Sequence, residues 1–308
     1  MGTPEFAVET LQAILDAGHE VPAVVTMPDK PAGRGQKIKM SAVKEFALSN
    51  GLRVLQPEKL KDENFIAELR SLNADLQVVV AFRMLPEIVW AMPRLGTINV
   101  HASLLPNYRG AAPINWAIIN GETKTGVSTF LLRHDIDTGD IIKQESVAIE
   151  PNDNAGTIHD KLMHLGAKLA VETIGLLEKG CATFNRQADI DPQTLRPAPK
   201  IFKDDMKINW SKNATDVINL IRGLSPYPAA WTEITDVKGD LYSLKIFSAH
   251  IVYDHVLGEG KVYSDGKKLL IFGASDHAIA IDELQLNGKK RMDVASLLRG
   301  FKIKNSDN

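Results

Sequence analysis

Residues 96–140 read GTINVHASLLPNYRGAAPINWAIINGETKTGVSTFLLRHDIDTGD, and this stretch decides the fold of the first part of the chain. Residues 97–101 alternate two β-branched side chains with Asn99 and His101, a pattern typical of a short buried strand. Side chains two residues apart share one face of a strand, so Asn99 and His101 point the same way near its carboxyl end. Because open α/β sheets bind their ligands at that end, we predict a functional site there.

A carboxylate follows in the loop RHDIDTGD, residues 133–140, which comes after a second predicted strand at 127–132. The glycine of this loop lets the backbone fold closely over a ligand. An asparagine amide can donate to a developing oxyanion, an imidazole can move a proton, and a carboxylate can orient the imidazole. We therefore predict that Asn99, His101 and Asp137 catalyse acyl transfer between nitrogen atoms, without an acylated side chain.

Each motif alone is more typical of structure than of catalysis, since Asn-x-His is commonly a satisfied polar pair and Asp-Thr-Gly a tight turn. Here they occur in order, with Ser-Leu-Leu-Pro at 103–106 between them. Together they resemble the folate-dependent formyltransferases. The sequence YRGAAP at 108–113 is most similar to the branch of that family that acts on methionyl-tRNA. The resemblance extends over nearly the whole chain.

The resemblance implies that the formyl donor is 10-formyltetrahydrofolate and the acceptor is the free amine of initiator methionyl-tRNA. It implies that Asn99 and His101 stabilise the oxyanion and that Asp137 holds His101 or an ordered water. In the family, the segment at 82–86 lines the pterin pocket, and Arg83 stands here where glycine is usual. The expected donor-binding residues are Phe82, Leu85, Ser103, Leu104, Leu105 and Pro106.

A basic loop at residues 28–39 carries four Lys or Arg residues among prolines and glycines. Such loops are usually solvated, but they can also contact phosphates and become ordered on binding. In the tRNA formyltransferases the corresponding loop lies near the active site and reaches the acceptor end of the tRNA. By that resemblance, the expected tRNA contacts are Arg34 and Lys37.

Strands and helices alternate up to Asn99, which predicts an α/β fold with a Rossmann-like, mostly parallel sheet. We expect a catalytic domain at 1–182, a polar linker at 183–200, and a small OB-like β-barrel at 201–308 that binds tRNA by resemblance. Thr3 is the expected cap of a first helix that ends at Gly18. Such a helix should follow a strand, so we expect the natural chain to carry one more strand upstream of Met1.

The composition, 44% hydrophobic and 24% charged over 308 residues, is that of an ordinary soluble protein. One cysteine, Cys181, excludes an internal disulfide framework and a cysteine-based zinc site, and the scattered histidines predict no metal. With a net charge of −2, any RNA contact requires local basic patches. The sequence has no signal peptide pattern and no apolar run long enough for a bilayer. We expect a monomeric cytoplasmic protein that does not bind membranes.

Nucleotide hydrolysis, dinucleotide redox chemistry, serine hydrolysis and metalloprotease chemistry lose support because their sequence motifs are absent. Two alternatives stay open. A sugar-nucleotide or other small-amine N-formyltransferase can also carry an Arg-Gly stretch and a C-terminal domain. A tRNA-binding protein with an inactive catalytic shell is the other, although all three catalytic residues are present. His134 lies near Asp137 and could compete with His101 for the catalytic role. The placement of His101 at a strand end favours His101.

Overall fold

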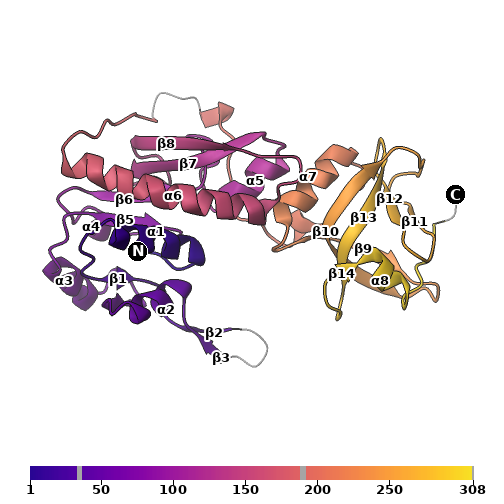
Figure 1. The fold of residues 1–308 in the computed structure, drawn as a ribbon, viewed down its shortest axis with the longest axis horizontal. Coiled ribbons are helices and arrows are strands. Elements are labelled where there is room, and N and C mark those ends of the chain that lie inside the picture. Colours follow the sequence, from indigo (N-terminus) through magenta and orange to yellow (C-terminus); the bar gives the residue numbers. More distant parts are fainter. Residues whose placement is uncertain (33–36, 188–191, 307–308) are drawn as a thin grey trace. The chain divides into compact units, whose positions relative to one another are not determined.

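The computed structural model describes residues 1–32, 37–187 and 192–306 (Figure 1). Its contacts divide the chain into two compact units, and each unit draws on separate stretches of sequence. The first unit comprises Met1–Gly110, Lys124–Val147 and His159–Pro197. The second comprises Ala111–Thr123, Ala148–Ile158 and Ala198–Asn308.

The first unit is built on short strands joined by helices. β1 (Val24–Val25) pairs in parallel with β4 (Val54–Leu55). A four-stranded sheet has the order β5 (Gln77–Val80), β6 (Thr97–His101), β7 (Lys124–Leu131) and β8 (Ile141–Ala148). The β5–β6 pair is parallel and the β6–β7 pair is antiparallel. The helices are α1 (Glu5–Asp16), α2 (Ala42–Ser49), α3 (Glu63–Ser71), α4 (Glu87–Trp90) and α6 (Ala155–Glu178), whose first turn belongs to the second unit.

Met1 and Gly2 lie between β1 and β5 and hydrogen-bond to both. The Gly2 N–H donates to the Val25 carbonyl over 3.0 Å, and the Val80 N–H donates to the Met1 carbonyl over 2.9 Å. Gly2 and Val80 form a parallel bridge. The chain then enters α1, whose N-cap is Pro4 and not Thr3 as the sequence predicted. The Thr3 hydroxyl is buried and, within the described residues, has no hydrogen-bond partner.

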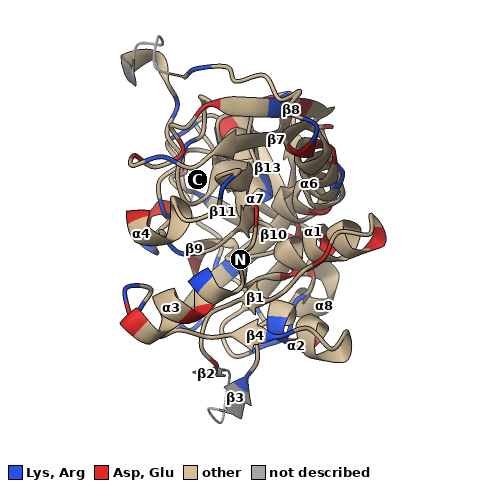
Figure 2. Cartoon of the chain, turned by 90° about the vertical axis from the view of Figure 1, so that its left-hand side faces the viewer, with Lys and Arg blue, Asp and Glu red and all other residues tan. Residues whose placement is uncertain are grey.

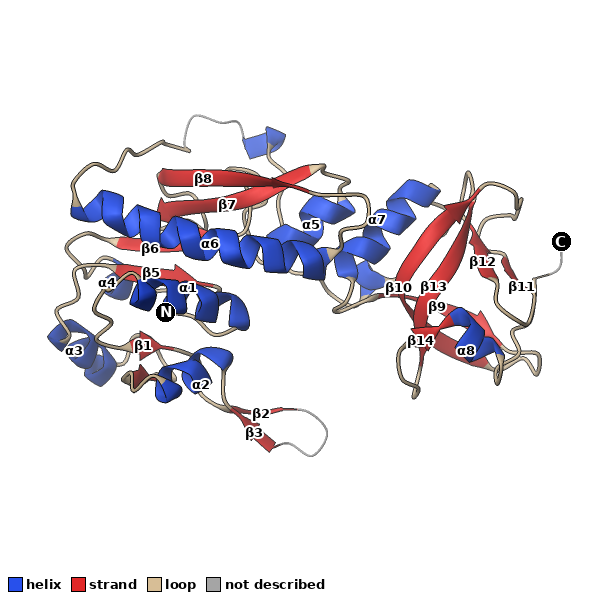
Figure 3. Cartoon of the chain, viewed as in Figure 1, coloured by secondary structure: helices blue, strands red, loops and turns tan. Residues whose placement is uncertain are grey.

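Helices cover the sheet of the first unit and supply its apolar core. One cluster joins Ile14 of α1 and Ile98 of β6 to Ile142 of β8 and Ile174 of α6. The helices and strands that carry these residues are labelled in Figures 1 and 3. A second cluster joins β1, β4 and β5 to α3 and α4. A hairpin of β2 (Lys30–Ala32) and β3 (Lys37–Lys39) occupies the basic segment that the sequence predicted as a loop. Its strands flank residues outside the described range.

The second unit is an antiparallel half-barrel accompanied by helices. Its strands are β9 (Ala230–Thr235), β10 (Leu241–Val252), β11 (Val262–Ser264), β12 (Leu270–Gly273), β13 (Ala278–Leu286) and β14 (Met292–Asp293). They are ordered β11-β12-β13-β10-β9, with β14 paired to β13. The α-helices of this unit are α5 (Pro113–Ile119), α7 (Ala214–Leu224) and α8 (Val294–Leu298), and the 3₁₀ turn η2 (Asp204–Met206) precedes α7. A 3₁₀ turn of the first unit, η1, spans Pro192–Thr194.

The predicted fold class is confirmed, because the chain combines an α/β sheet with an antiparallel half-barrel. Basic and acidic residues are both scattered over the elements in Figure 2, in keeping with a net charge of −2. None of the helices within the described ranges has the length and apolar character required to span a bilayer.

Candidate active site

Strand β6 places Asn99 and His101 on one face, in agreement with the alternation read from the sequence. Its bounds are those predicted, and Asn99 pairs with Val79 of β5 and Phe130 of β7. Asn99 is half-buried, whereas His101 is only 7% exposed. Among the described residues, the Asn99 carboxamide has no hydrogen-bond partner, so its donors can turn to a substrate.

The two nitrogens of His101 face different partners. Nε2 lies 2.9 Å from the Tyr108 carbonyl oxygen, which can only accept, so Nε2 carries the hydrogen. Nδ1 faces Asp137 Oδ2 across 3.7 Å, a separation longer than a direct hydrogen bond. The ring also packs edge-on against Phe130, with the centroids 6.4 Å apart. The edge of His101 that faces Asp137 is therefore the one available to exchange a proton.

The Asp137 carboxylate is held by a close backbone contact. Its Oδ2 accepts from the Gly110 N–H over 2.9 Å, and the residue is only 9% exposed. Asp137 has a φ of +55°, in the left-handed region that costs an L-residue conformational energy. Two residues on, Gly139 packs against β7, where an added Cβ would lie 1.6 Å from the Leu131 carbonyl oxygen. Glycine is thus required at position 139 because the loop backbone passes too close to the backbone of Leu131 to leave room for a side chain.

Arg109 and Gln187 join this loop, and neither was predicted from the sequence. The Gln187 side chain accepts from Arg109 and donates to the carbonyls of Asp137 and Gly139. Partial burial lowers the pKa of Arg109, and the nearby charge of Asp137 opposes that change. Arg109 belongs to a motif that the sequence singled out, whereas Gln187 lies in the polar segment interpreted as a linker, where no local pattern marks it.

The Ser-Leu-Leu-Pro segment is fixed against β7 and β8. Ser128 Oγ accepts from the Leu105 N–H over 3.0 Å and donates to the Ser103 carbonyl over 2.6 Å. Gln144 Nε2 donates to the Leu105 carbonyl over 2.8 Å, and the Leu105 side chain packs with Phe130. The remaining predicted members of the segment, Leu104 and Pro106, are half-buried. The structure thus brings this segment to the strands that carry His101 and the Asp137 loop.

The segment at 82–86 packs beside α4. Leu85 is buried in the cluster that includes Val89, and the half-buried Phe82 packs against that cluster. Arg83 turns toward the preceding loop, where its guanidinium donates to the Pro57 and Glu58 carbonyls. Backbone acceptors therefore satisfy the two terminal nitrogens of this arginine, whereas within the described residues its buried Nε has no hydrogen-bond partner. The Arg83 guanidinium carbon lies 5.7 Å from the centroid of the Phe82 ring.

A cavity of about 380 Å³ lies beside the Asp137 loop. His134 is not buried like His101; its side chain is 75% exposed and its Nε2 lies 2.9 Å from Glu87. Leu85 packs in the same cluster as two of the lining residues. The lining residues are Trp90, Ala91, Gly96, Thr97, Leu131, Leu132, Arg133, His134, Asp135 and Thr138.

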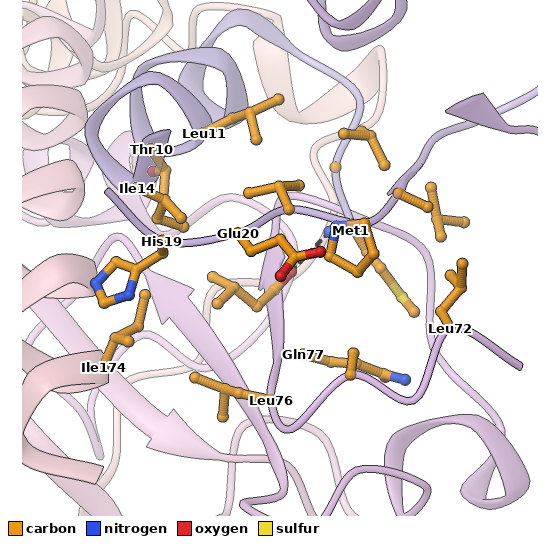
Figure 4. Close-up of a pocket in the computed structure, with 18 of the residues that line it drawn as sticks. Met1, Thr10, Leu11, Ile14, His19, Glu20, Leu72, Leu76, Gln77 and Ile174 are labelled. Carbon is orange, nitrogen blue, oxygen red and sulfur yellow. Dashed lines mark hydrogen bonds between the residues drawn. The ribbon is translucent and has the colours of Figure 1, made fainter. Parts of the chain in front are cut away.

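A larger cavity, about 430 Å³, lies between β1 and β5 and is lined mainly by apolar side chains (Figure 4). Asn99, His101 and Asp137 line neither this cavity nor the one beside the Asp137 loop, which is bounded by Asp135 and Thr138. The Met1 amine donates to the Val78 carbonyl over 2.6 Å inside this cavity, called the slot below, and burial lowers the pKa of the amine to about 5. By volume alone, this cavity would be the candidate binding site. The polar side chains that converge are instead those at the end of β6 and in the Asp137 loop.

The side chains of the two predicted tRNA contacts, Arg34 and Lys37, lie outside what the structure describes. Arg34 lies outside the described residues. Lys37 begins β3 and pairs with Ala32, and its side chain is not described. Within the described part of the chain, no group of three or more His, Cys, Asp or Glu side chains is arranged to hold a metal ion.

Comparison with known proteins identifies similarity over both units. A family described as "Formyl transferase" matches residues 1–174, and its C-terminal domain matches residues 200–302. A methionyl-tRNA formyltransferase of Bacteroides fragilis is 53% identical over 305 residues, covering 98% of this chain and 94% of the relative. One of Phocaeicola vulgatus is 55% identical over 312 residues, covering 100% and 96%.

Solved structures with lower identity share the fold. WlaRD, a sugar 3N-formyl transferase solved with dTDP and 5-N-formyl-THF, is 21% identical with a TM-score of 0.65. The match covers 94% of this chain and 97% of that one. HypX from Aquifex aeolicus, in complex with tetrahydrofolic acid, is 18% identical with a TM-score of 0.59, covering 82% of this chain and 43% of that one.

Proposed function

The chain belongs to the formyltransferase family, and from that premise we propose that it formylates initiator methionyl-tRNA, with 10-formyltetrahydrofolate as donor. Relatives that are 53–55% identical over nearly the whole chain are named methionyl-tRNA formyltransferase. The observation that carries the proposal is the pairing of His101 with Asp137 beside the half-buried Asn99 amide. The product, N-formylmethionyl-tRNA, serves translation initiation.

The reaction needs one bond made, one broken and one proton moved. The methionyl amine attacks the formyl carbon, and the bond from that carbon to the folate nitrogen then breaks. Asn99 and His101 stabilise the oxyanion formed in between. His101 Nδ1 takes the proton that the amine loses, and the proton is delivered to the folate nitrogen. Asp137 stabilises the imidazolium at the intermediate stage.

We assign the donor to the cavity beside the Asp137 loop. Trp90 and the leucines at 131 and 132 offer apolar walls, and Thr97 adds a polar group, which suits a flat heteroaromatic ring with polar edges. The segment at 103–106 and the Phe82 and Leu85 side chains complete the proposed donor site. Fixing the reactants in one pocket supplies much of the rate without a covalent enzyme intermediate.

We assign tRNA binding to Arg34, Lys37 and the second unit. In that unit the ammonium groups of Lys203 and Lys207 lie 5.6 and 5.0 Å from the centre of the Trp231 ring. Trp231 is half-buried, and basic side chains next to a partly accessible aromatic ring suit a nucleic-acid backbone. We further propose that the protein acts as a monomer in the cytoplasm, where its tRNA substrate is used.

The test is formyl transfer from labelled 10-formyltetrahydrofolate to methionyl-tRNA, to an amino-sugar nucleotide, or with no acceptor. We expect the wild-type protein to transfer label to methionyl-tRNA and the Asn99→Ala variant to lose this transfer. Label on the amino-sugar nucleotide alone would replace the proposal with sugar formylation. No label on any acceptor, with tRNA binding retained, would leave a binding protein.

A further inference from the structure

Both polar atoms of the Gln187 side chain form hydrogen bonds, the nitrogen to the Asp137 loop and the oxygen to Arg109. Its Nε2 donates to the Asp137 carbonyl over 3.0 Å and to the Gly139 carbonyl over 2.6 Å. Its Oε1 accepts from Arg109 Nη2 over 2.8 Å and from Nε over 3.3 Å. The residue is only 3% exposed. Two donors and one acceptor are thus matched to three separate groups in a buried setting.

These bonds act on a backbone conformation that costs an L-residue free energy. Asp137 has a φ of +55°, and the residue is not a glycine. The bonds from Gln187 fix the peptide carbonyls at Asp137 and two residues later. Without them, relaxation of φ at Asp137 would turn its carboxylate away from the Gly110 N–H and from His101.

The same amide ties together the two loops that meet at the carboxylate. Arg109 precedes Gly110, whose N–H donates to Asp137 Oδ2 over 2.9 Å. Tyr108, on the other side of Arg109, accepts from His101 Nε2 over 2.9 Å. The segment at 108–110 therefore contacts both catalytic side chains, and the Arg109 side chain anchors this segment to Gln187.

Gln187 is itself placed by backbone pairing. Asn185 and Ile141 at the start of β8 exchange two hydrogen bonds, of 2.9 and 2.8 Å. This bridge brings a segment far along the chain to the edge of the sheet. The side chain of Gln187 then reaches the turn immediately before β8, so its position follows from the fold and not from a flexible tail.

On the basis of the proposed function, we propose that Gln187, together with Arg109, is a positioning residue that holds the Asp137 carboxylate opposite His101. Neither side chain needs to touch the substrate for this role. The requirement is for an amide: a Glu would set a carboxylate against two carbonyl oxygens, and a Met would fill the space without hydrogen bonds.

Gln187→Met should lower kcat about 10–100-fold, because a displacement of about 1 Å at a catalytic group costs on that order. The KM values for methionyl-tRNA and donor should stay within about twofold. In an Asp137→Ala background the same change should have no further effect on kcat, since there is no carboxylate left to position. An equal loss of kcat in both backgrounds, or no loss in either, would overturn the proposal.

Gln187→Glu gives a signature that a general loss of stability would not produce. The kcat of this variant relative to wild type should rise as the pH is lowered, because a protonated carboxyl again donates a hydrogen bond to a carbonyl. Gln285→Glu is the matched control, since Gln285 Nε2 donates to the Lys289 carbonyl at a hairpin of the second unit. Its kcat relative to wild type should not change with pH. A flat ratio for Gln187→Glu would count against the amide requirement.

A readout independent of activity separates this proposal from the proposed function. Hydrogen exchange of the Gly110 amide, which donates to Asp137 Oδ2, should become at least about tenfold faster in Gln187→Met. If wild type formylates no acceptor but this exchange changes as expected, the proposed function fails and the positioning role stands. Unchanged exchange at Gly110 would refute the positioning role whatever the activity.

Discussion

The first unit encloses ionisable groups at two places, and they differ in how those groups are partnered. At the slot between β1 and β5, the Met1 amine donates to one carbonyl, and burial lowers its pKa to about 5. At the end of β6, the Asp137 carboxylate accepts from a backbone N–H and faces the imidazole of His101. Burial with a single neutral acceptor favours the uncharged form of the amine, whereas burial beside an N–H donor and an imidazole orients the carboxylate for proton transfer.

The two places also differ in what a change should affect. Around the slot, side chains support stability and do not contact the proposed chemistry. Around β6, changes should lower the rate with less effect on folding, because the hydrogen-bonded groups there converge on reacting atoms. The comparison therefore predicts that kinetic and folding measurements separate the two regions.

The largest effect is expected at the imidazole. His101→Ala should lower kcat by roughly 10²–10⁴, because it removes the proton-transfer group. Steady-state formylation of methionyl-tRNA measures this. His164→Ala is the control, since that histidine lies on α6 and pairs with Glu9 at 2.9 Å, away from the catalytic side chains. A loss of similar size in both variants would contradict the assignment of the site.

Burial of the Met1 amine in the slot should make the free energy of unfolding depend on pH. The unfolded Met1 amine, with an ordinary pKa of 8.0, binds a proton between pH 5 and 8, whereas the folded amine, with a pKa of about 5, does not. The free energy of unfolding should therefore fall as the pH drops from 8 to 5, by at most about 4 kcal/mol.

Urea unfolding at several pH values measures this dependence for the chain that begins at Met1. Acetylation of the amine is the control, because it removes the titrating group and should flatten this part of the profile. Equal slopes with and without the acetyl group would show that the amine does not titrate as its burial requires.

Gly139 tests whether backbone packing at the loop matters to the rate. In Gly139→Ala the new Cβ would lie 1.6 Å from the Leu131 carbonyl oxygen, so the loop that carries Asp137 must move. We expect kcat to fall about 100-fold and stability to fall by about 1–3 kcal/mol.

Gly175→Ala is the matched control for that change. Gly175 lies in α6, and an added Cβ there would meet nothing within 4 Å. It should leave kcat unchanged and stabilise the protein by about 0.4–1 kcal/mol, because alanine restricts the unfolded chain. Thermal unfolding and formylation assays compare the two variants; a harmless Gly139→Ala would show that the loop can relax.

Local signals allowed much of the first unit to be predicted. The alternation at 97–101 gave β6 its bounds, and Ser41 and Asp62 cap α2 and α3 through their side chains. The Thr3 cap was wrong because pairing of the preceding Gly2 between two strands fixes the entry to α1, and Pro4 becomes the N-cap. Capping patterns cannot report a constraint imposed by strand pairing.

The missed elements depend on contacts between residues distant in sequence. Helix α5 was not predicted from the sequence, since it is short and follows a segment that contains Pro106 and Gly110. It is stabilised in the second unit by α7, where Gly223 leaves room for Ile119 and its carbonyl accepts from Asn115. Gln187 was missed for a similar reason, because the bridge between Asn185 and Ile141, which are far apart in the sequence, brings it to the catalytic loop.

The smallest predicted effect concerns two buried threonines of the first unit. Within the described residues, the Thr10 hydroxyl, which lines the slot, has no hydrogen-bond partner, whereas Thr173 Oγ1 bonds to the Leu169 carbonyl at 2.7 Å and to Thr129 at 2.8 Å. Thr10→Val should stabilise the protein by about 1 kcal/mol, because it removes a buried, unsatisfied group. Thr173→Val should destabilise it by about the same amount. Urea unfolding measures both; stabilisation by both would mean that apolar packing outweighs hydrogen bonding across this core.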